Sequence, residues 1–169
     1  MNWQDFVESR RNFLAAGAGL AAAATLGKSA FAEETPALKS ELISIAEAEL
    51  EPGQAVGQTP QGTRNIVYVK SGTCTGKVAG KILPGGGDWL LVRPDGIGEI
   101  DVRATIQADD GALIYTHYRG ILNFQTGYFR TTPRYETASE KYKWLNDIVA
   151  VGVGQSIPTG VRYHLYDIL

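Results

Sequence analysis

Short runs of alternating apolar and polar residues fill the chain from about residue 42 to its end. In the clearest run, Gly98–Gln107, the even-numbered positions from Ile100 onward are apolar and the odd-numbered positions are polar. A period of two residues places successive side chains on opposite faces, as in a half-buried strand. The same pattern predicts nine strands, over residues 42–50, 62–69, 77–83, 88–93, 98–107, 112–122, 127–132, 148–153 and 161–168.

Turn signals separate these runs. Asp110–Gly111 lies between two alternating runs and predicts a tight hairpin, and Pro84–Gly87 predicts another hairpin turn. One segment has helical signals, because Thr137 can cap a helix and Glu140 follows three residues later. We expect that helix over residues 138–146. One short helix among many short strands predicts a mostly β fold, an antiparallel barrel or sandwich.

The first 32 residues have the pattern of a twin-arginine export signal. Arg10 and Arg11 precede the apolar run Leu14–Leu26, and Ala30–Ala32 is a small-x-small cleavage site. The apolar run is too short to cross a hydrocarbon core of ~30 Å comfortably. We therefore expect a signal peptide over residues 1–32, a flexible leader over 33–37, and one periplasmic domain over 38–169.

The charge of the remaining chain limits its partners. The formal charge of the whole chain is −2, and it becomes −3 without residues 1–32, which carry three basic and two acidic residues. No basic stripe remains, so we expect no nucleic acid partner. The expected partners are the twin-arginine (Tat) translocase, a small-molecule ligand, and a second copy of the chain if the glycine-rich run 149–154 packs against it.

Motifs for metals, nucleotides and covalent catalysis are missing from the sequence. The two histidines, His117 and His164, lie far apart, and the single cysteine, Cys74, has no recognisable partner and is expected to be buried. There is no paired-cysteine motif, phosphate-binding glycine loop or nucleophile elbow. We therefore expect no metal and no cofactor.

Charged and aromatic residues within the predicted strands are the remaining candidates for chemistry. In one interpretation they form the solvated outer face of a sheet, with Asp101 pairing with Arg103 or Arg119. In the other, a barrel encloses a ligand and some inward positions are polar, so that side chains converge on one cavity, namely Asp101, Arg103, Tyr115 and Arg130.

Several motifs resemble an uncharacterised bacterial and fungal family known as domain of unknown function 3237. They include Gly85–Trp89, Asp101–Arg103, Tyr128–Thr131, Glu136–Thr137 and Trp144–Asn146. The resemblance covers about residues 38–169 and implies a single β-barrel similar in shape to allene oxide cyclase and the lipocalins. It implies little about activity. The resemblance implies that a set of polar residues defines the family. These residues suit either a structural network or a pocket, and they are Asp88, Asp101, Arg103, Tyr128, Arg130, Glu136 and Asn146.

Two functions remain open. The first is a cofactor-free acid–base enzyme of the isomerase, cyclase, hydratase or lyase type. Its predicted catalytic residues are Asp101, Asp88 and Tyr115, and its predicted substrate-binding residues are Arg103, Arg130, Tyr128, Trp89 and Glu136. The second is a lipocalin-like periplasmic protein that binds a small hydrophobic acid, with the arginines as the carboxylate clamp. The direction in which Asp88 and Asp101 point would distinguish a cavity from a solvated face.

Overall fold

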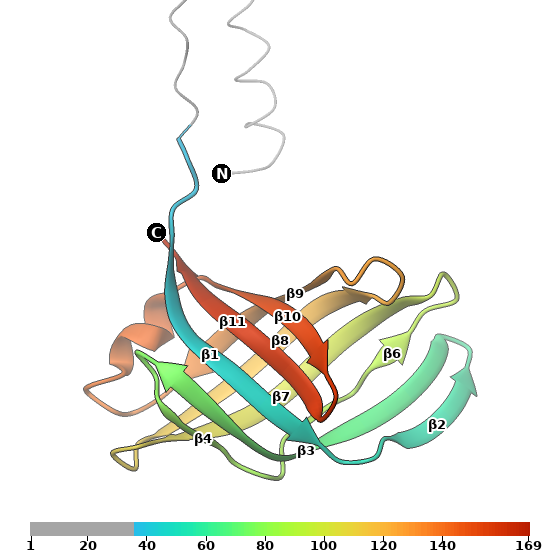
Figure 1. The fold of residues 1–169 in the computed structure, drawn as a ribbon, viewed down its shortest axis with the longest axis horizontal. Coiled ribbons are helices and arrows are strands. Elements are labelled where there is room, and N and C mark those ends of the chain that lie inside the picture. Colours follow the sequence, from blue (N-terminus) through green and yellow to red (C-terminus); the bar gives the residue numbers. More distant parts are fainter. Residues whose placement is uncertain (1–35) are drawn as a thin grey trace, which may run out of the picture. The chain divides into compact units, whose positions relative to one another are not determined.

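The computed structural model describes residues 36–169, and their regular secondary structure consists of strands and one short helix (Figure 1). Residues Ala37–Leu169 make up one compact unit. The predicted signal, its cleavage site and most of the leader lie outside the described residues. The strands are β1 Ser40–Leu50, β2 Gln54–Thr59, β3 Gly62–Gly76, β4 Gly80–Ile82, β5 Gly87–Asp88, β6 Leu91–Val92, β7 Ile97–Ala108, β8 Leu113–Asn123, β9 Phe129–Glu136, β10 Ala150–Ile157 and β11 Gly160–Ile168, and the 3-10 helix η1 spans Lys143–Asp147.

The strands close into an antiparallel barrel. β7 to β11 pair in chain order, and β1 closes the barrel because it pairs with β11 on one side and with β3 on the other (Figure 1). β4, β5 and β6 each pair with both β3 and β7 and so act together as one interrupted strand of an eight-stranded barrel. β2 pairs with β3 alone. The prediction of a single antiparallel β-barrel is confirmed.

The alternation in β7 has the predicted orientation. Its apolar positions, from Ile100 to Ala108, are buried in the barrel core, and its polar positions are more exposed. The predicted hairpin at Asp110–Gly111 joins β7 to β8. The Asp110 side chain accepts a hydrogen bond from the Ala112 N–H at 3.2 Å, and Gly111 adopts a φ of +87°. Gly111 thus takes the left-handed conformation that this turn needs.

The prediction of a hairpin turn at Pro84–Gly87 is wrong. β4 and β5 flank this segment, and both lie between β3 and β7, so the chain does not reverse direction there. Pro84 and Gly85 only interrupt the strand, and the Gly86 carbonyl then accepts a hydrogen bond from Val69 at 2.9 Å. A Cβ on Gly86 would lie 2.5 Å from the carbonyl oxygen of Arg103, so this close approach requires glycine.

The predicted helix over residues 138–146 is shorter and of a different type. Only η1 is helical, and Leu145 donates a hydrogen bond to the carbonyl of Tyr142, an i to i+3 contact. Thr137 does not cap an α-helix but accepts from the nearby Ser139 N–H. The side chain of Asn146 bonds to both the N–H and the carbonyl of Thr137, which ties this segment into a compact loop. Tyr142 and Leu145 pack into the barrel core.

Candidate functional site

A small cavity lies inside the half of the barrel opposite η1. Its volume is about 120 Å³. Half-buried apolar residues at the strand ends, such as Leu50 at the end of β1 and Val161 near the start of β11, line it at the barrel's rim. Further apolar side chains line it more deeply, and Asp88 is its only carboxyl group. A charged residue in such surroundings is the first candidate for function.

The pairing of β5 with β7 turns Asp88 inward. Asp88 lies opposite Val102, whose side chain belongs to the core. The N–H of Asp101 donates to Asp88 Oδ1 at 3.0 Å, and the Trp89 N–H donates to the carbonyl of Asp101 at 2.9 Å. Neighbouring residues Asp88 and Trp89 are thus fixed against β7, and Trp89 contributes to the outer surface while Asp88 lines the cavity.

Burial raises the pKa of Asp88 to about 6. The hydrogen bond from the Asp101 N–H lowers this pKa, and the more distant Arg64 guanidinium also lowers it, but neither offsets the loss of solvent. A carboxyl group with a pKa near 6 can both accept and release a proton close to neutral pH.

Two tyrosines and Ser156 complete the polar part of the cavity. Tyr118 of β8 and Tyr163 of β11 line it, and their rings meet edge to face with centroids 5.6 Å apart. A hydrogen bond joins the two side chains, and burial holds the pKa of each well above its ordinary value. Both hydroxyls therefore stay protonated. The Tyr163 proton is used in the bond between them, so the Tyr118 hydroxyl is the one that can donate a hydrogen bond to a ligand.

The core beside these tyrosines holds two further unpaired groups. The Tyr135 hydroxyl is buried and has no hydrogen-bond partner among the described residues. Cys74 is buried as predicted, and burial raises the pKa of its thiol to about 12. Neither lines the cavity.

The other predicted site residues do not share this cavity. Asp101 and Arg103 lie on the outer face of β7 and pair at 3.2 Å, as the solvated-face interpretation expects. The Arg103 guanidinium lies over the Trp89 ring at 5.2 Å. The predicted convergence of Asp101, Arg103, Tyr115 and Arg130 inside the barrel is therefore wrong.

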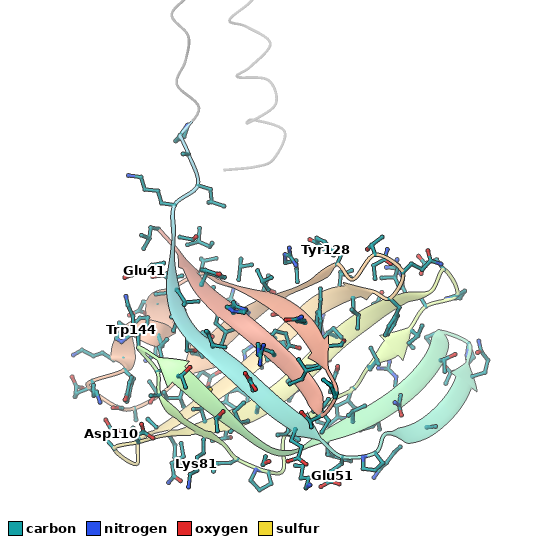
Figure 2. The ribbon with its side chains drawn as sticks, viewed as in Figure 1. Glu41, Glu51, Lys81, Asp110, Tyr128 and Trp144 are labelled. Carbon is teal, nitrogen blue, oxygen red and sulfur yellow. The ribbon has the colours of Figure 1, made fainter. Side chains whose placement is uncertain are left out.

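Tyr115 and Glu136 occupy a different place. They face each other across β8 and β9 and line a shallow surface depression. Tyr115 also stacks with His117 at 5.7 Å. Tyr128 lies in the loop between β8 and β9 at the edge of the barrel, with the Arg130 guanidinium 4.9 Å from its ring (Figure 2).

Tyr118 and Tyr163 were not among the predicted site residues. In β8 the predicted candidate Tyr115 follows the outward phase with His117 and Arg119. The inward phase consists of Ile114, Thr116 and Tyr118. The alternation could have found Tyr118, since it shares the phase of a buried isoleucine. Among residues 36–169, no three histidine, cysteine, aspartate or glutamate side chains gather as a metal site. No helix in the same range is long and apolar enough to cross a membrane.

Comparison with known proteins identifies the family of the chain. A family model described as "Protein of unknown function (DUF3237)" matches residues 39–127 and 123–168. The chain belongs to the DUF3237 family. A UPF0311 protein of Bradyrhizobium diazoefficiens is 31% identical over 133 residues, which cover 69% of this chain and 88% of that protein. A UPF0311 protein of Clostridium acetobutylicum is 36% identical over 124 residues, 63% of this chain and 78% of that protein.

Solved structures of similar proteins agree with the fold. A β-barrel-like protein from Acinetobacter baumannii superposes with a TM-score of 0.75 at 33% identity, over 81% of this chain and 99% of that one. A protein with unknown function from C. acetobutylicum gives a TM-score of 0.74 at 34% identity, over 79% and 100% of the two chains. A protein described as an enzyme from Penicillium herquei has the same fold, with a TM-score of 0.67 at 21% identity over 80% and 98%.

Proposed function

We propose that the barrel interior binds a small, mostly apolar molecule and that Asp88 transfers a proton on it. The observation that carries this proposal is a carboxyl group facing an apolar cavity beside two tyrosine hydroxyls. The pKa of Asp88, near 6, suits a group that acts as base and then as acid. The fold of the Penicillium herquei enzyme is consistent with a barrel of this kind carrying chemistry.

The arrangement suits the isomerisation of a small carbonyl compound. The Asp88 carboxylate would take a proton from the carbon next to the carbonyl, and the Tyr118 hydroxyl would donate a hydrogen bond to the carbonyl oxygen. Asp88 would then return the proton to another carbon, so that the product is an isomer of the substrate. These steps need only side chains that line the cavity.

The volume of the cavity limits the substrate. A cavity of about 150 Å³ in another protein accepts benzene, and this one has about 120 Å³. A molecule about the size of a six-membered ring therefore fits with little rearrangement. We accordingly choose small cyclic ketones as probes.

Hydrogen exchange tests the proposed proton transfer. The full chain would be incubated in D₂O with cyclohexanone and 2-cyclohexenone, and deuterium uptake would be followed by mass spectrometry. We expect deuterium uptake faster than in buffer alone. In Asp88→Asn we expect the rate of uptake to fall by at least about 100-fold, a typical contribution of a general base. Asp101→Asn is the matched control and should keep it, because Asp101 faces outward. Equal uptake by wild type and Asp88→Asn would contradict the assignment of Asp88.

The alternative is a protein that binds a small molecule without catalysis. The apolar lining of the cavity favours binding alone as much as it favours an enzyme. No arginine lines the cavity among the described residues, so the proposed ligand is neutral rather than a carboxylate held by an arginine clamp. Ligand retention in dialysis without exchange, in both wild type and Asp88→Asn, would support binding alone.

We also propose that the chain acts in the periplasm after twin-arginine export. The support is the order of Arg10, Arg11, the apolar run and the small-x-small site in the sequence. Residues 1–33 fused to a reporter should direct export, and changing Arg10 and Arg11 together to lysine should abolish it. Export that survives the double substitution would contradict this assignment.

A further inference from the structure

A second, larger hollow lies on the outer surface of the barrel. This outer groove has a volume of about 840 Å³, within the range of ordinary small-molecule sites. Residues of β7, β8 and β9 form much of it, and the β5–β6 segment and β10 contribute Trp89, Leu91 and Val151. The groove is separate from the interior cavity, although Ile100 of β7 contributes to both.

Arginines dominate the charge of the outer groove. Arg64, Arg119 and Arg130 line it together with two carboxylates, Glu99 and Asp101. Among the ion pairs between described residues, none joins these three arginines to a carboxylate.

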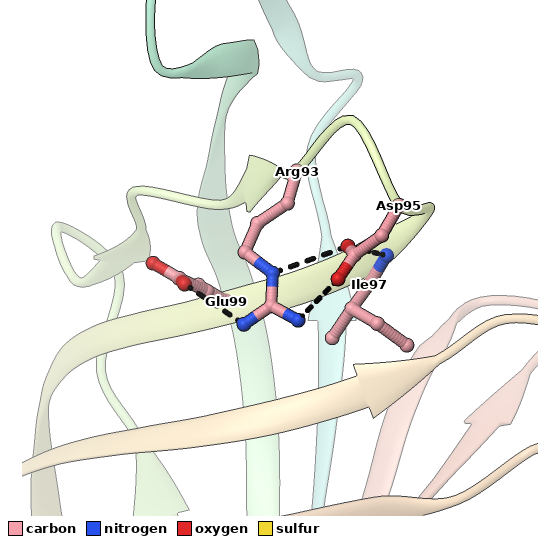
Figure 3. A network of polar contacts seen from close by, with 4 residues as sticks. All are labelled: Arg93, Asp95, Ile97 and Glu99. Atoms are coloured by element: carbon pink, nitrogen blue, oxygen red, sulfur yellow. Dashed lines mark hydrogen bonds and ion pairs between the residues drawn. The ribbon is translucent and has the colours of Figure 1, made fainter.

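Each of the two groove carboxylates forms an ion pair with an arginine that does not line the groove. Asp101 pairs with Arg103 at 3.2 Å. Glu99 pairs with Arg93 at 3.4 Å, and Figure 3 shows the Arg93 guanidinium held between Asp95 and Glu99. Since three arginines and only two carboxylates line the groove, it has an excess of positive charge that a bound anion would balance.

Two of the groove arginines are held in place by the backbone. Arg64 donates to the carbonyl of Trp89, and Arg130 donates to the carbonyl of Phe129 at 2.9 Å. Each uses part of a guanidinium group that has five donors, so donors remain for a ligand. A guanidinium fixed in this way loses less side-chain entropy on binding.

Apolar and aromatic side chains form the rest of the groove. Tyr128 is 51% exposed and Ile121 39% exposed, and both line the groove with Trp89 and Val151. Figure 2 shows Tyr128 on the β8–β9 loop at the edge of the barrel. Exposed aromatic and aliphatic surface next to arginines suits a ligand that has an aromatic body and an anionic group.

We propose that the outer groove binds an aromatic carboxylate, with the carboxylate between Arg119 and Arg130 and the ring against Tyr128 and Trp89. The planar guanidinium fork matches the geometry of a carboxylate. This site is distinct from the interior cavity, goes beyond the function proposed for it, and does not depend on Asp88.

Calorimetric titration with 2-naphthoate tests the outer groove. We expect measurable binding to the full chain, and at least ten-fold weaker binding by 2-naphthylmethanol, which has the same rings and no charge. Arg130→Gln and Arg119→Gln should each raise Kd about ten-fold, which corresponds to about 1.4 kcal/mol. Arg134→Gln is the matched control, because it removes the same charge from the same outward face of β9 but lies outside the groove.

Arg134→Gln and Asp88→Asn should both leave Kd within two-fold of wild type. The proposal is overturned if 2-naphthoate does not bind at millimolar concentration, or if the neutral alcohol binds as well. It is also overturned if Arg134→Gln weakens binding as much as Arg130→Gln, which would indicate general charge attraction, or if Asp88→Asn abolishes binding, which would place the ligand in the interior cavity.

Discussion

A carboxyl group that faces apolar side chains is harder to ionise than one in water, and Asp88 is in this situation. Below about pH 4 it is protonated in both the folded and the unfolded chain. Between about pH 4 and pH 6 the unfolded chain releases this proton while the folded chain retains it, so Asp88 makes the folded protein less stable as the pH rises. Above about pH 6 the loss of stability caused by the buried Asp88 carboxylate is complete and no longer changes with pH.

Replacement of Asp88 by asparagine removes this cost and keeps an oxygen for the Asp101 N–H. We expect Asp88→Asn to raise the free energy of unfolding by about 2 kcal/mol at pH 8 and to leave it unchanged near pH 4. Urea denaturation at the two pH values measures this, and Asp109→Asn, in the exposed β7–β8 turn, serves as control. A loss of stability at pH 8 would show that Asp88 has a structural role instead.

Among the elements, β10 depends most visibly on glycine. Gly152 and Gly154 are buried, and a Cβ on Gly154 would lie 2.6 Å from the ring of Phe129. The sequence predicted a strand in this glycine-rich run but not which of its faces turns inward. The glycines take the inward positions because β9 packs closely there.

Gly154→Ala should therefore destabilise the barrel by about 1–3 kcal/mol through overpacking. Gln155→Ala, next to it and exposed, should change the free energy of unfolding by less than about 0.5 kcal/mol. Denaturation of Gly154→Ala combined with Phe129→Leu provides a further check, because the smaller side chain should relieve part of the clash. If the losses of unfolding free energy caused by the two substitutions simply add in the double variant, the packing of Gly154 against Phe129 would be contradicted.

At the scale of the whole molecule, the interior cavity and the outer groove share one wall but face opposite sides of it. Val161→Phe at the rim should fill the cavity and prevent ligand entry, while the outer groove keeps its binding. Val149→Phe, at an exposed position that lines neither site, is the control and should leave both the interior cavity and the outer groove accessible. Ketone exchange and 2-naphthoate titration on both variants test this independence. Loss of both ketone exchange and 2-naphthoate binding in a folded Val161→Phe variant would contradict it.

The alternation of the sequence was sufficient to locate the strands of the barrel wall and the apolar face of β7. It missed β2, and it ended two strands too early, at residue 69 in β3 and at residue 132 in β9. It was not sufficient to place Asp88, because β5 has only two residues and follows the break at Pro84 and Gly85, where the alternation loses its phase. The inward direction of Asp88 follows from its register with Val102, and register between strands distant in sequence comes from closure of the barrel rather than from local pattern. For the same reason, the sequence could not show that the predicted site residues on the outer face of β7 and β8 lie on the opposite side of the barrel wall from Asp88.

The most direct test of the account is the ionisation of Asp88 itself. Carbon-13 NMR of the aspartate carboxyl groups, with Asp88→Asn used to assign the signal, would give its titration midpoint in the folded protein. A carboxyl facing the apolar cavity should titrate near pH 6. A midpoint near pH 4, as for an aspartate in water, would show that Asp88 is solvated and would contradict the proposed site.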